Sequence, residues 1–142
     1  MAVVVADQVA KLLVERSIPL GDRVSLLPWL SLTHVHNRGI AFSLLGGVSW
    51  LLPAGIALTL LFLLFYNRTR WTRGVVARPA LALLAAGAIG NLIDRLRVGA
   101  VIDYVDLSVW PVFNLADVAV TLGAGLLVLT VLRPDRHLAR GN

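Results

Sequence analysis

The chain has 142 residues, of which 58% are hydrophobic and only 15% charged, and its mean hydropathy is +0.81. A soluble domain averages about 45–50% apolar and about 25% charged residues, so this composition indicates an integral membrane protein and excludes a large soluble domain. The net charge of +5 comes almost wholly from arginine, which fits a membrane orientation signal better than nucleic-acid binding. Because the chain has no cysteine, disulfides, thiolate nucleophiles and cysteine-ligated metals are excluded.

Four apolar stretches are predicted to cross the membrane, since one helical span needs about 20 residues. They cover, approximately, residues 1–17, 48–67, 79–96 and 114–132. The first is short and interrupted by charged residues, so either it is thinly anchored at its start or the natural chain begins upstream. Small residues from Ala85 to Gly90 in the third span permit close approach of another helix.

Residues 18–47, between the first two spans, carry turn formers and short strand-like runs. The alternation of apolar and polar residues from Trp29 to Thr33 slips by one residue near His34, which predicts a small, bulged sheet. We expect this region to form a β-cradle on the membrane surface. Residues 97–113 form a second non-helical segment, which leads into the fourth span.

Arginine asymmetry predicts how the chain is oriented. The loop between the second and third spans carries four arginines, and the tail after the fourth span carries three. By the positive-inside rule both are cytoplasmic, so both termini are inside, and the cradle and residues 97–113 face the extracytoplasmic side. The expected fold class is a mainly α membrane protein, a single domain with four transmembrane helices and a small extracytoplasmic β-cradle.

Two aspartates lie beside membrane-spanning stretches: Asp103 precedes the fourth span, and Asp117 lies one turn into it. A carboxylate near hydrocarbon is costly and therefore indicates function. If residues 97–113 fold back, the two carboxyls can share one proton, as in an aspartic protease, so that one activates water and the other polarises the substrate carbonyl. Asn114, three residues before Asp117, can face the same side of that helix. Proton or cation conduction is an alternative use of such carboxylates, and simple helix capping is another.

Further polar residues gather near the ends of two other spans. Asn91, Asp94 and Arg95 share one helical face at the end of the third span, where we expect Asp94 to pair with its neighbours. Arg95 has the chemistry to hold a lipid phosphate or a substrate carbonyl. Asp7 and Lys11 are four residues apart on the first helix, so an internal ion pair is the favoured interpretation.

The segment around residues 34–43 offers weaker candidates. The amide of Asn37 could hydrogen-bond an extended substrate backbone, although asparagine is also common in turns. His34 and His36 would share one face of a strand, but no third ligand lies nearby in the sequence, so we expect no metal. A Ser/Lys protease built from Ser43 and Lys11 is a weaker candidate still, because nothing in the sequence places the two residues together.

Five short blocks occur in one order along the chain, and together they are specific. They are DQVAK at 7–11, NRGIAFS at 37–43, GNLIDR at 90–95, VIDY at 101–104 and FNLAD at 113–117. In these blocks the chain resembles the lipoprotein signal peptidases, the type II signal peptidases of bacteria. It departs from them at the start, because only six residues precede Asp7 whereas the family usually has a longer first helix.

The resemblance implies a four-helix aspartic endopeptidase of the bacterial cytoplasmic membrane, with Asp103 and Asp117 as the catalytic dyad. It implies that Asp94 is mainly structural and that four residues surround the active site: Asn37, Asn91, Arg95 and Asn114. The implied substrate is a prolipoprotein that is cut just before its diacylglyceryl-modified cysteine. The expected partners are this substrate and membrane lipids but no nucleic acid, and we expect a monomer that needs no metal or cofactor. Inhibition by globomycin-type cyclic peptides is also implied, and the small-residue face of the third span could leave room for a signal peptide.

Overall fold

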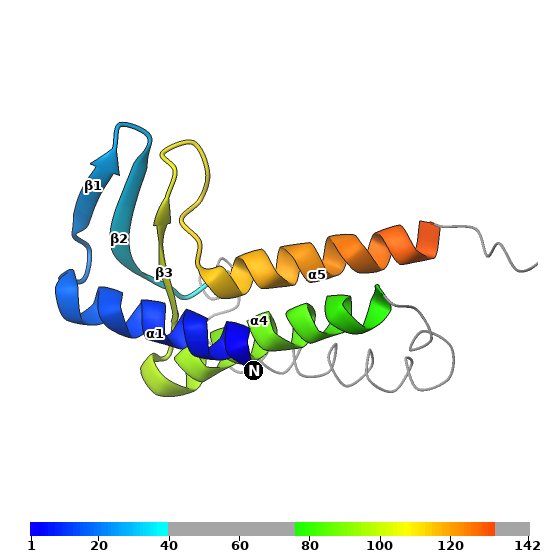
Figure 1. The fold of residues 1–142 in the computed structure, drawn as a ribbon. Helices are drawn as coiled ribbons and strands as arrows, with labels where there is room; N and C mark the ends of the chain where they lie inside the picture. Colours follow the sequence, from blue (N-terminus) through cyan, green and yellow to red (C-terminus); the bar gives the residue numbers. More distant parts are fainter. Residues whose placement is uncertain (40–75, 133–142) are drawn as a thin grey trace, which may run out of the picture.

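The computed structural model describes residues 1–39 and 76–132. The described helices are α1 (Ala2–Ser17), α4 (Ala77–Val98) and α5 (Leu115–Leu132), and the strands are β1 (Arg23–Leu27), β2 (Leu30–Asn37) and β3 (Val101–Asp106). The three helices run roughly alongside one another, and the sheet stands at one end of them (Figure 1). The predicted span at 48–67, part of the predicted cradle, and Ser43 lie outside the described residues.

Among residues 1–39 and 76–132, α4 is long and apolar enough to cross a membrane, and α5 contains a shorter apolar stretch, Leu115–Thr130. These helices approach each other closely through glycines. A Cβ atom added to Gly87 would overlap the carbonyl oxygen of Ala116, and one added to Gly123 would lie 2.7 Å from the carbonyl oxygen of Ala80. The small residues therefore do permit close helix packing, as predicted, but between α4 and α5 they leave no room for a signal peptide.

The sheet is antiparallel, in the order β1-β2-β3. In β2 the register against β3 shifts between Leu32 and Val35, which confirms the bulge predicted near His34. The third strand of this sheet, β3, comes from the predicted non-helical segment 97–113 and lies outside the predicted cradle region 18–47. Its residues Val101 to Tyr104 are all buried, so the segment lacks the apolar–polar alternation that identifies a half-exposed strand.

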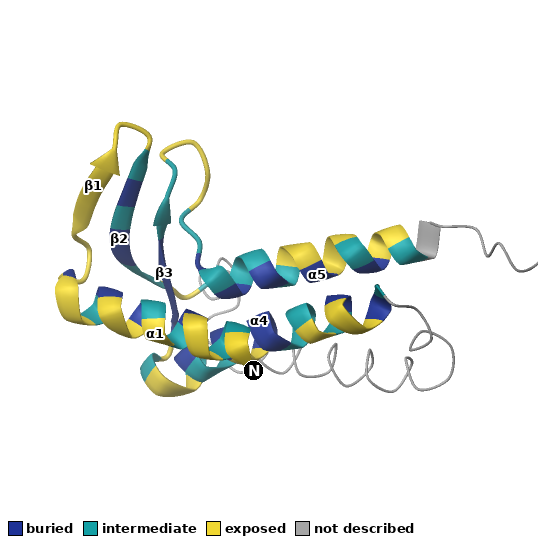
Figure 2. Ribbon diagram, viewed as in Figure 1, coloured by how far each residue is buried: buried dark blue, intermediate teal, exposed yellow. Residues whose placement is uncertain are grey.

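Polar side chains fill much of the junction between sheet and helices. The side chains that are most completely buried include Ile102 and five polar residues: Asp7, Lys11, Asp94, Asp103 and Asn114. β1 is exposed along its length, whereas β3 is buried where it meets the helices (Figure 2). Burying charged groups is costly unless they are paired and hydrogen-bonded, so this junction demands a complete set of partners.

Candidate active site

Backbone pairing after β3 brings the two aspartates together. Phe113 O accepts hydrogen bonds from the backbone nitrogens of Tyr104 at 3.1 Å and Val105 at 2.8 Å, and Phe113 N donates to Val105 O at 3.1 Å. The loop between them is thereby closed, and Asp103 lies beside the first turn of α5. The segment does fold back in the way that a carboxyl pair requires.

Asn114 links both aspartates. Its Oδ1 accepts the backbone N–H of Asp117 at 2.9 Å, and its own backbone N–H donates to Asp117 Oδ2 at 3.3 Å. This reciprocal pattern is a capping box at the start of α5, with aspartate in the place usually held by glutamate. The remaining polar atom, Nδ2, donates to Asp103 Oδ1 at 2.7 Å. One fully buried side chain therefore contacts both members of the predicted dyad.

Asp103 is 2% exposed, and both of its carboxyl oxygens accept hydrogen bonds. The second donor is Asn37 Nδ2, at 2.8 Å from Asp103 Oδ2, while Asn37 Oδ1 accepts the backbone N–H of Gly39 at 2.8 Å. Burial raises the pKa of Asp103 to about 6, and the charge of Asp117 adds to this rise, while the hydrogen bonds from Asn37 and Asn114 oppose it. Asp103 is thus suited to keep a proton at mildly acidic pH.

Asp117 is held from the side of α4. Asn91 Nδ2 donates to Asp117 Oδ1 at 2.8 Å, and Asn91 Oδ1 accepts from Lys11 Nζ at 3.0 Å. Because an ammonium group can only donate, Lys11 fixes which end of the Asn91 amide faces Asp117. Arg95 Nη1 donates to the backbone oxygen of Asn91 at 3.2 Å, and its charge acts on both Asp117 and Asp103.

A buried ionic cluster supports these contacts. Lys11 Nζ lies 2.9 Å from Asp7 Oδ2 and 2.6 Å from Asp94 Oδ2, and all three side chains are 0% exposed. The predicted ion pair of Asp7 and Lys11 therefore forms, with Asp94 as a second partner. Asp7 Oδ1 accepts the backbone N–H of Ala116 at 2.9 Å, and Asp94 Oδ2 accepts that of Ile102 at 3.2 Å. The cluster consequently ties α1 and α4 to β3 and to the first turn of α5.

Sequence reasoning missed two residues of this network. Gln8 Nε2 donates to Asp94 Oδ1 at 3.0 Å and to the backbone oxygen of Gly90 at 3.1 Å. The hydroxyl of Tyr104 accepts the backbone N–H of Leu115 at 3.3 Å. Gln8 follows Asp7 in the DQVAK block, and Tyr104 follows Asp103 in the VIDY block. Membership of these two blocks is the sequence feature that could have identified them.

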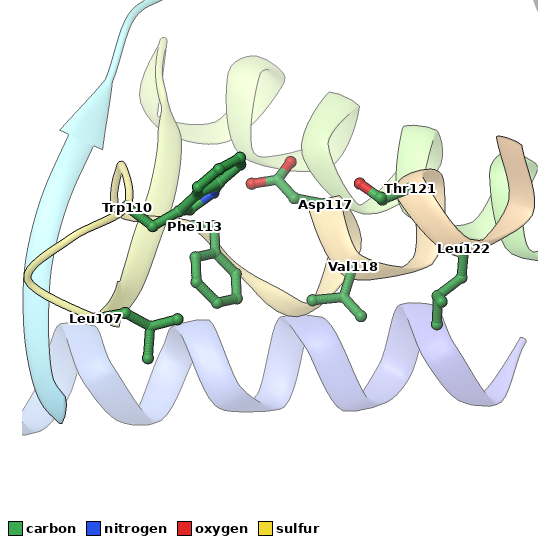
Figure 3. A pocket seen from close by; sticks show the side chains of 7 residues that line it. All are labelled: Leu107, Trp110, Phe113, Asp117, Val118, Thr121 and Leu122. Carbon is green, nitrogen blue, oxygen red and sulfur yellow. The ribbon is translucent and has the colours of Figure 1, made fainter. Parts of the chain in front are cut away.

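An open, largely apolar pocket of about 420 Å³ adjoins Asp117. Of the described residues in its lining, only Asp117 is charged. Figure 3 shows that this lining comes from the loop after β3 and from one side of α5: Leu107, Trp110, Phe113, Asp117, Val118, Thr121 and Leu122. A pocket with apolar walls and a single carboxylate at its edge has the general character of a small-molecule or side-chain binding site. The predicted residues Asn37, Asn91, Arg95 and Asn114 all join this network. Within the described part of the chain, no hydrogen bond or ion pair joins His34 or His36 to either aspartate.

Comparisons with known proteins agree with this geometry. The family model described as "Signal peptidase (SPase) II" matches residues 1–133. The lipoprotein signal peptidases of Brucella ovis and Brucella canis are each 48% identical over 134 residues, which covers 89% of this chain and 82% of theirs. A bacterial membrane enzyme solved by the in meso method at 1.9 Å resolution is 31% identical, with a TM-score of 0.84 over 92% of this chain and 88% of that one. Another, solved at 2.3 Å resolution, is 29% identical, with a TM-score of 0.85 over 99% of this chain and 88% of that one.

Proposed function

The chain belongs to the signal peptidase II family and removes signal peptides from prolipoproteins, and from this premise we propose that Asp103 and Asp117 are its catalytic dyad. The observation that carries the proposal is Asn114, whose side-chain Nδ2 donates to the Asp103 carboxyl and whose backbone N–H donates to the Asp117 carboxyl. Asp117 lines the apolar pocket, and Asp103 is joined to it through their shared partner Asn114.

The two carboxyls take different roles. Asp117, ionised, removes a proton from a water molecule, and the resulting hydroxide attacks the carbonyl carbon of the scissile peptide. Asp103, whose pKa is raised by burial, gives its proton to the carbonyl oxygen, so that a neutral gem-diol forms. Asp117 then passes its proton to the leaving nitrogen as the C–N bond breaks. One gem-diol hydroxyl returns a proton to Asp103, which restores the starting state of the dyad.

The substrate's lipid and the apolar pocket supply the binding energy. A diacylglyceryl-modified prolipoprotein already lies in the bilayer, so its lipid chains fix the scissile bond close to the membrane surface. The pocket beside Asp117 accepts an apolar group next to that bond. Arg95 and Asn37 flank the carboxyls and are available to hold the substrate backbone. Cleavage falls just before the lipidated cysteine and needs no metal or cofactor.

The remaining features of the expected topology belong to the same proposal. The chain crosses the bacterial cytoplasmic membrane four times, both termini are cytoplasmic, and the active site faces the extracytoplasmic side. It contacts membrane lipids and works as a monomer, since every residue assigned a role in cleavage comes from one chain.

The test is cleavage of a diacylglyceryl-modified prolipoprotein by purified variants in detergent. Asp103→Asn and Asp117→Asn should each lower kcat by at least about 1,000-fold, because each removes a proton-transfer group. Asp106→Asn is the matched control: it lies on the same strand, where its carboxylate faces Arg23 at 3.8 Å and accepts from Ser108 N. This control should cleave within a few-fold of the parent. Unimpaired cleavage by a folded Asp103→Asn or Asp117→Asn protein would refute the assignment.

A further inference from the structure

A second cluster of ligand-type side chains lies between α1 and β2. Glu15, His34 and His36 each offer one ligand atom, and these atoms all lie within 4.8 Å of one another. From the sequence we expected no metal because no third ligand lies near the two histidines. The fold supplies that ligand from the last turn of α1.

The two histidines have buried nitrogens without partners. His34 is 6% exposed, and its Nδ1 lies 2.8 Å from the carbonyl oxygen of Ile18. Because a carbonyl only accepts, Nδ1 carries the proton, and Nε2 presents a free lone pair. Nε2 of His34 and Nε2 of His36 are both buried and have no hydrogen-bond partner among residues 1–39 and 76–132. Buried polar atoms are normally satisfied, so these two indicate a missing ligand.

The hydrogen bond between His34 and Ile18 is of the kind that orients a metal-binding histidine. A metal-binding histidine usually donates its other ring N–H to a carbonyl or carboxylate, as His34 does to Ile18. The ring centroids of His34 and His36 are 5.2 Å apart, so the rings are close neighbours. The site lies at the C-terminal end of α1, where the helix dipole favours a cation.

Arg97 competes with a metal ion for Glu15. Its Nη1 and Nη2 donate to Glu15 Oε1 at 3.1 Å and Oε2 at 2.7 Å. Each carboxylate oxygen has a second lone pair, so Glu15 can hold Arg97 and still bind a metal ion. The positive charge of Arg97 nevertheless opposes a second cation and should weaken its binding.

We propose that Glu15, His34 and His36 form a binding site for Zn²⁺, with water completing the coordination, and that the ion fastens β2 to α1. Two imidazole nitrogens and one carboxylate form a ligand set that zinc favours. Asp103 pairs with Val35 in the sheet, and alternation places Val35 on the opposite face of β2 from the two histidines. The ion is therefore structural, and it steadies the strand that ends at Asn37.

Zinc titration of the tag-free protein in detergent tests the proposal. Calorimetry should give one Zn²⁺ per chain, Co²⁺ should produce the visible absorption bands of a site with nitrogen and oxygen ligands, and saturating zinc should raise the unfolding temperature by about 5 °C. His36→Gln and Glu15→Gln should each weaken zinc binding by at least about tenfold, since each removes a ligand. Arg97→Gln should instead strengthen it. Glu15 and His36 are both half-buried, so both variants should fold.

The third histidine of the sequence, His137, provides the matched control, because it belongs to the tail that is predicted to be cytoplasmic, on the opposite side of the membrane from the cradle. His137→Gln should leave the zinc affinity and the cobalt spectrum unchanged. The proposal is overturned if the parent binds no zinc, or if His137→Gln weakens binding as much as His36→Gln does. It is also overturned if Glu15→Gln and His36→Gln bind zinc as tightly as the parent.

Discussion

Asn114 Nδ2 donates to Asp103 Oδ1 at 2.7 Å, while Asn114 Oδ1 accepts the backbone N–H of Asp117 at 2.9 Å. The residue that caps α5 therefore also sets the position of Asp103 relative to Asp117. Asn114 therefore has two tasks: it caps the helix and it holds Asp103 near Asp117. A substitution that keeps the cap can still separate the two carboxyls.

Asn114→Ser should separate capping from catalysis. Serine caps a helix about as well as asparagine, so the loss in the free energy of unfolding should stay within the about 1–3 kcal/mol that the unpaired buried oxygen of Asp103 costs. The short hydroxyl cannot also reach Asp103, and loss of this positioned donor should lower kcat/KM by about 100-fold. Thermal unfolding and cleavage kinetics measure the two effects. Cleavage at the parental rate by Asn114→Ser would contradict the bridging role.

Lys11→Met should be strongly destabilising. It leaves the buried carboxylates of Asp7 and Asp94 without their cation, and breaking a buried pair costs about 3–5 kcal/mol. Replacing the whole cluster by Lys11→Met, Asp7→Asn and Asp94→Asn together should recover part of that loss, because no unpaired charge remains. Denaturant unfolding in detergent measures both variants.

The surface ion pair of Glu15 and Arg97 is the control for Lys11. Arg97 is 40% exposed, and exposed pairs contribute about 0–1 kcal/mol, so Arg97→Gln should unfold nearly as the parent does. Should Lys11→Met prove as mild as Arg97→Gln, the buried cluster would have no special part in holding the site together.

Gly87→Ala should push α4 away from α5. The added Cβ would overlap the backbone oxygen of Ala116, next to Asp117, and would lie 2.7 Å from a methyl of Val120. Overpacking of this kind costs about 1–3 kcal/mol, and the shift of α5 should also reduce cleavage. Gly125→Ala has open space around the new methyl and should be neutral or slightly stabilising. Equal stability and activity of the two variants would show that the helices are not closely packed at Gly87.

Cleavage should depend on the protonation of Asp103. This carboxyl must be protonated to polarise the substrate, and its pKa is raised to about 6, so kcat/KM should fall as the pH rises through about 6. The free energy of unfolding should also fall as the pH rises, because the raised pKa means that the folded protein binds this proton more tightly than the unfolded chain does. The contribution of Asp103 is therefore present below its ordinary pKa of 3.8 and is lost as the pH rises to about 6. In Asp103→Asn the free energy of unfolding should therefore change less with pH between these two values.

Local pattern and composition predicted much of the site. The spacing of Asn114 and Asp117 correctly placed both on one turn, and Asp7 and Lys11 pair at four residues apart. The long-range contacts had no such signal. β3 is buried on both faces and so lacks alternation, and Glu15 meets the two histidines only because α1 lies against β2.

The role of Asn91 was also beyond local reasoning. Its amide faces Lys11 on one side and Asp117 on the other, and these partners come from two different helices. A spacing rule on a single helix relates Asn91 only to Asp94 and Arg95, so it identifies the polar face but not what that face holds.

Infrared titration of the carboxyl groups tests the shared-proton dyad most directly. In the difference spectrum between the parent and Asp103→Asn, the absorption band of a protonated carboxyl should disappear as the pH rises, with an apparent pKa of about 6. In Asp117→Asn this pKa should fall, because the repulsion from the second carboxylate is gone. A band that titrates near the ordinary value of 3.8 in the parent, and does not move in Asp117→Asn, would contradict the account, because Asp103 would then have no proton to give.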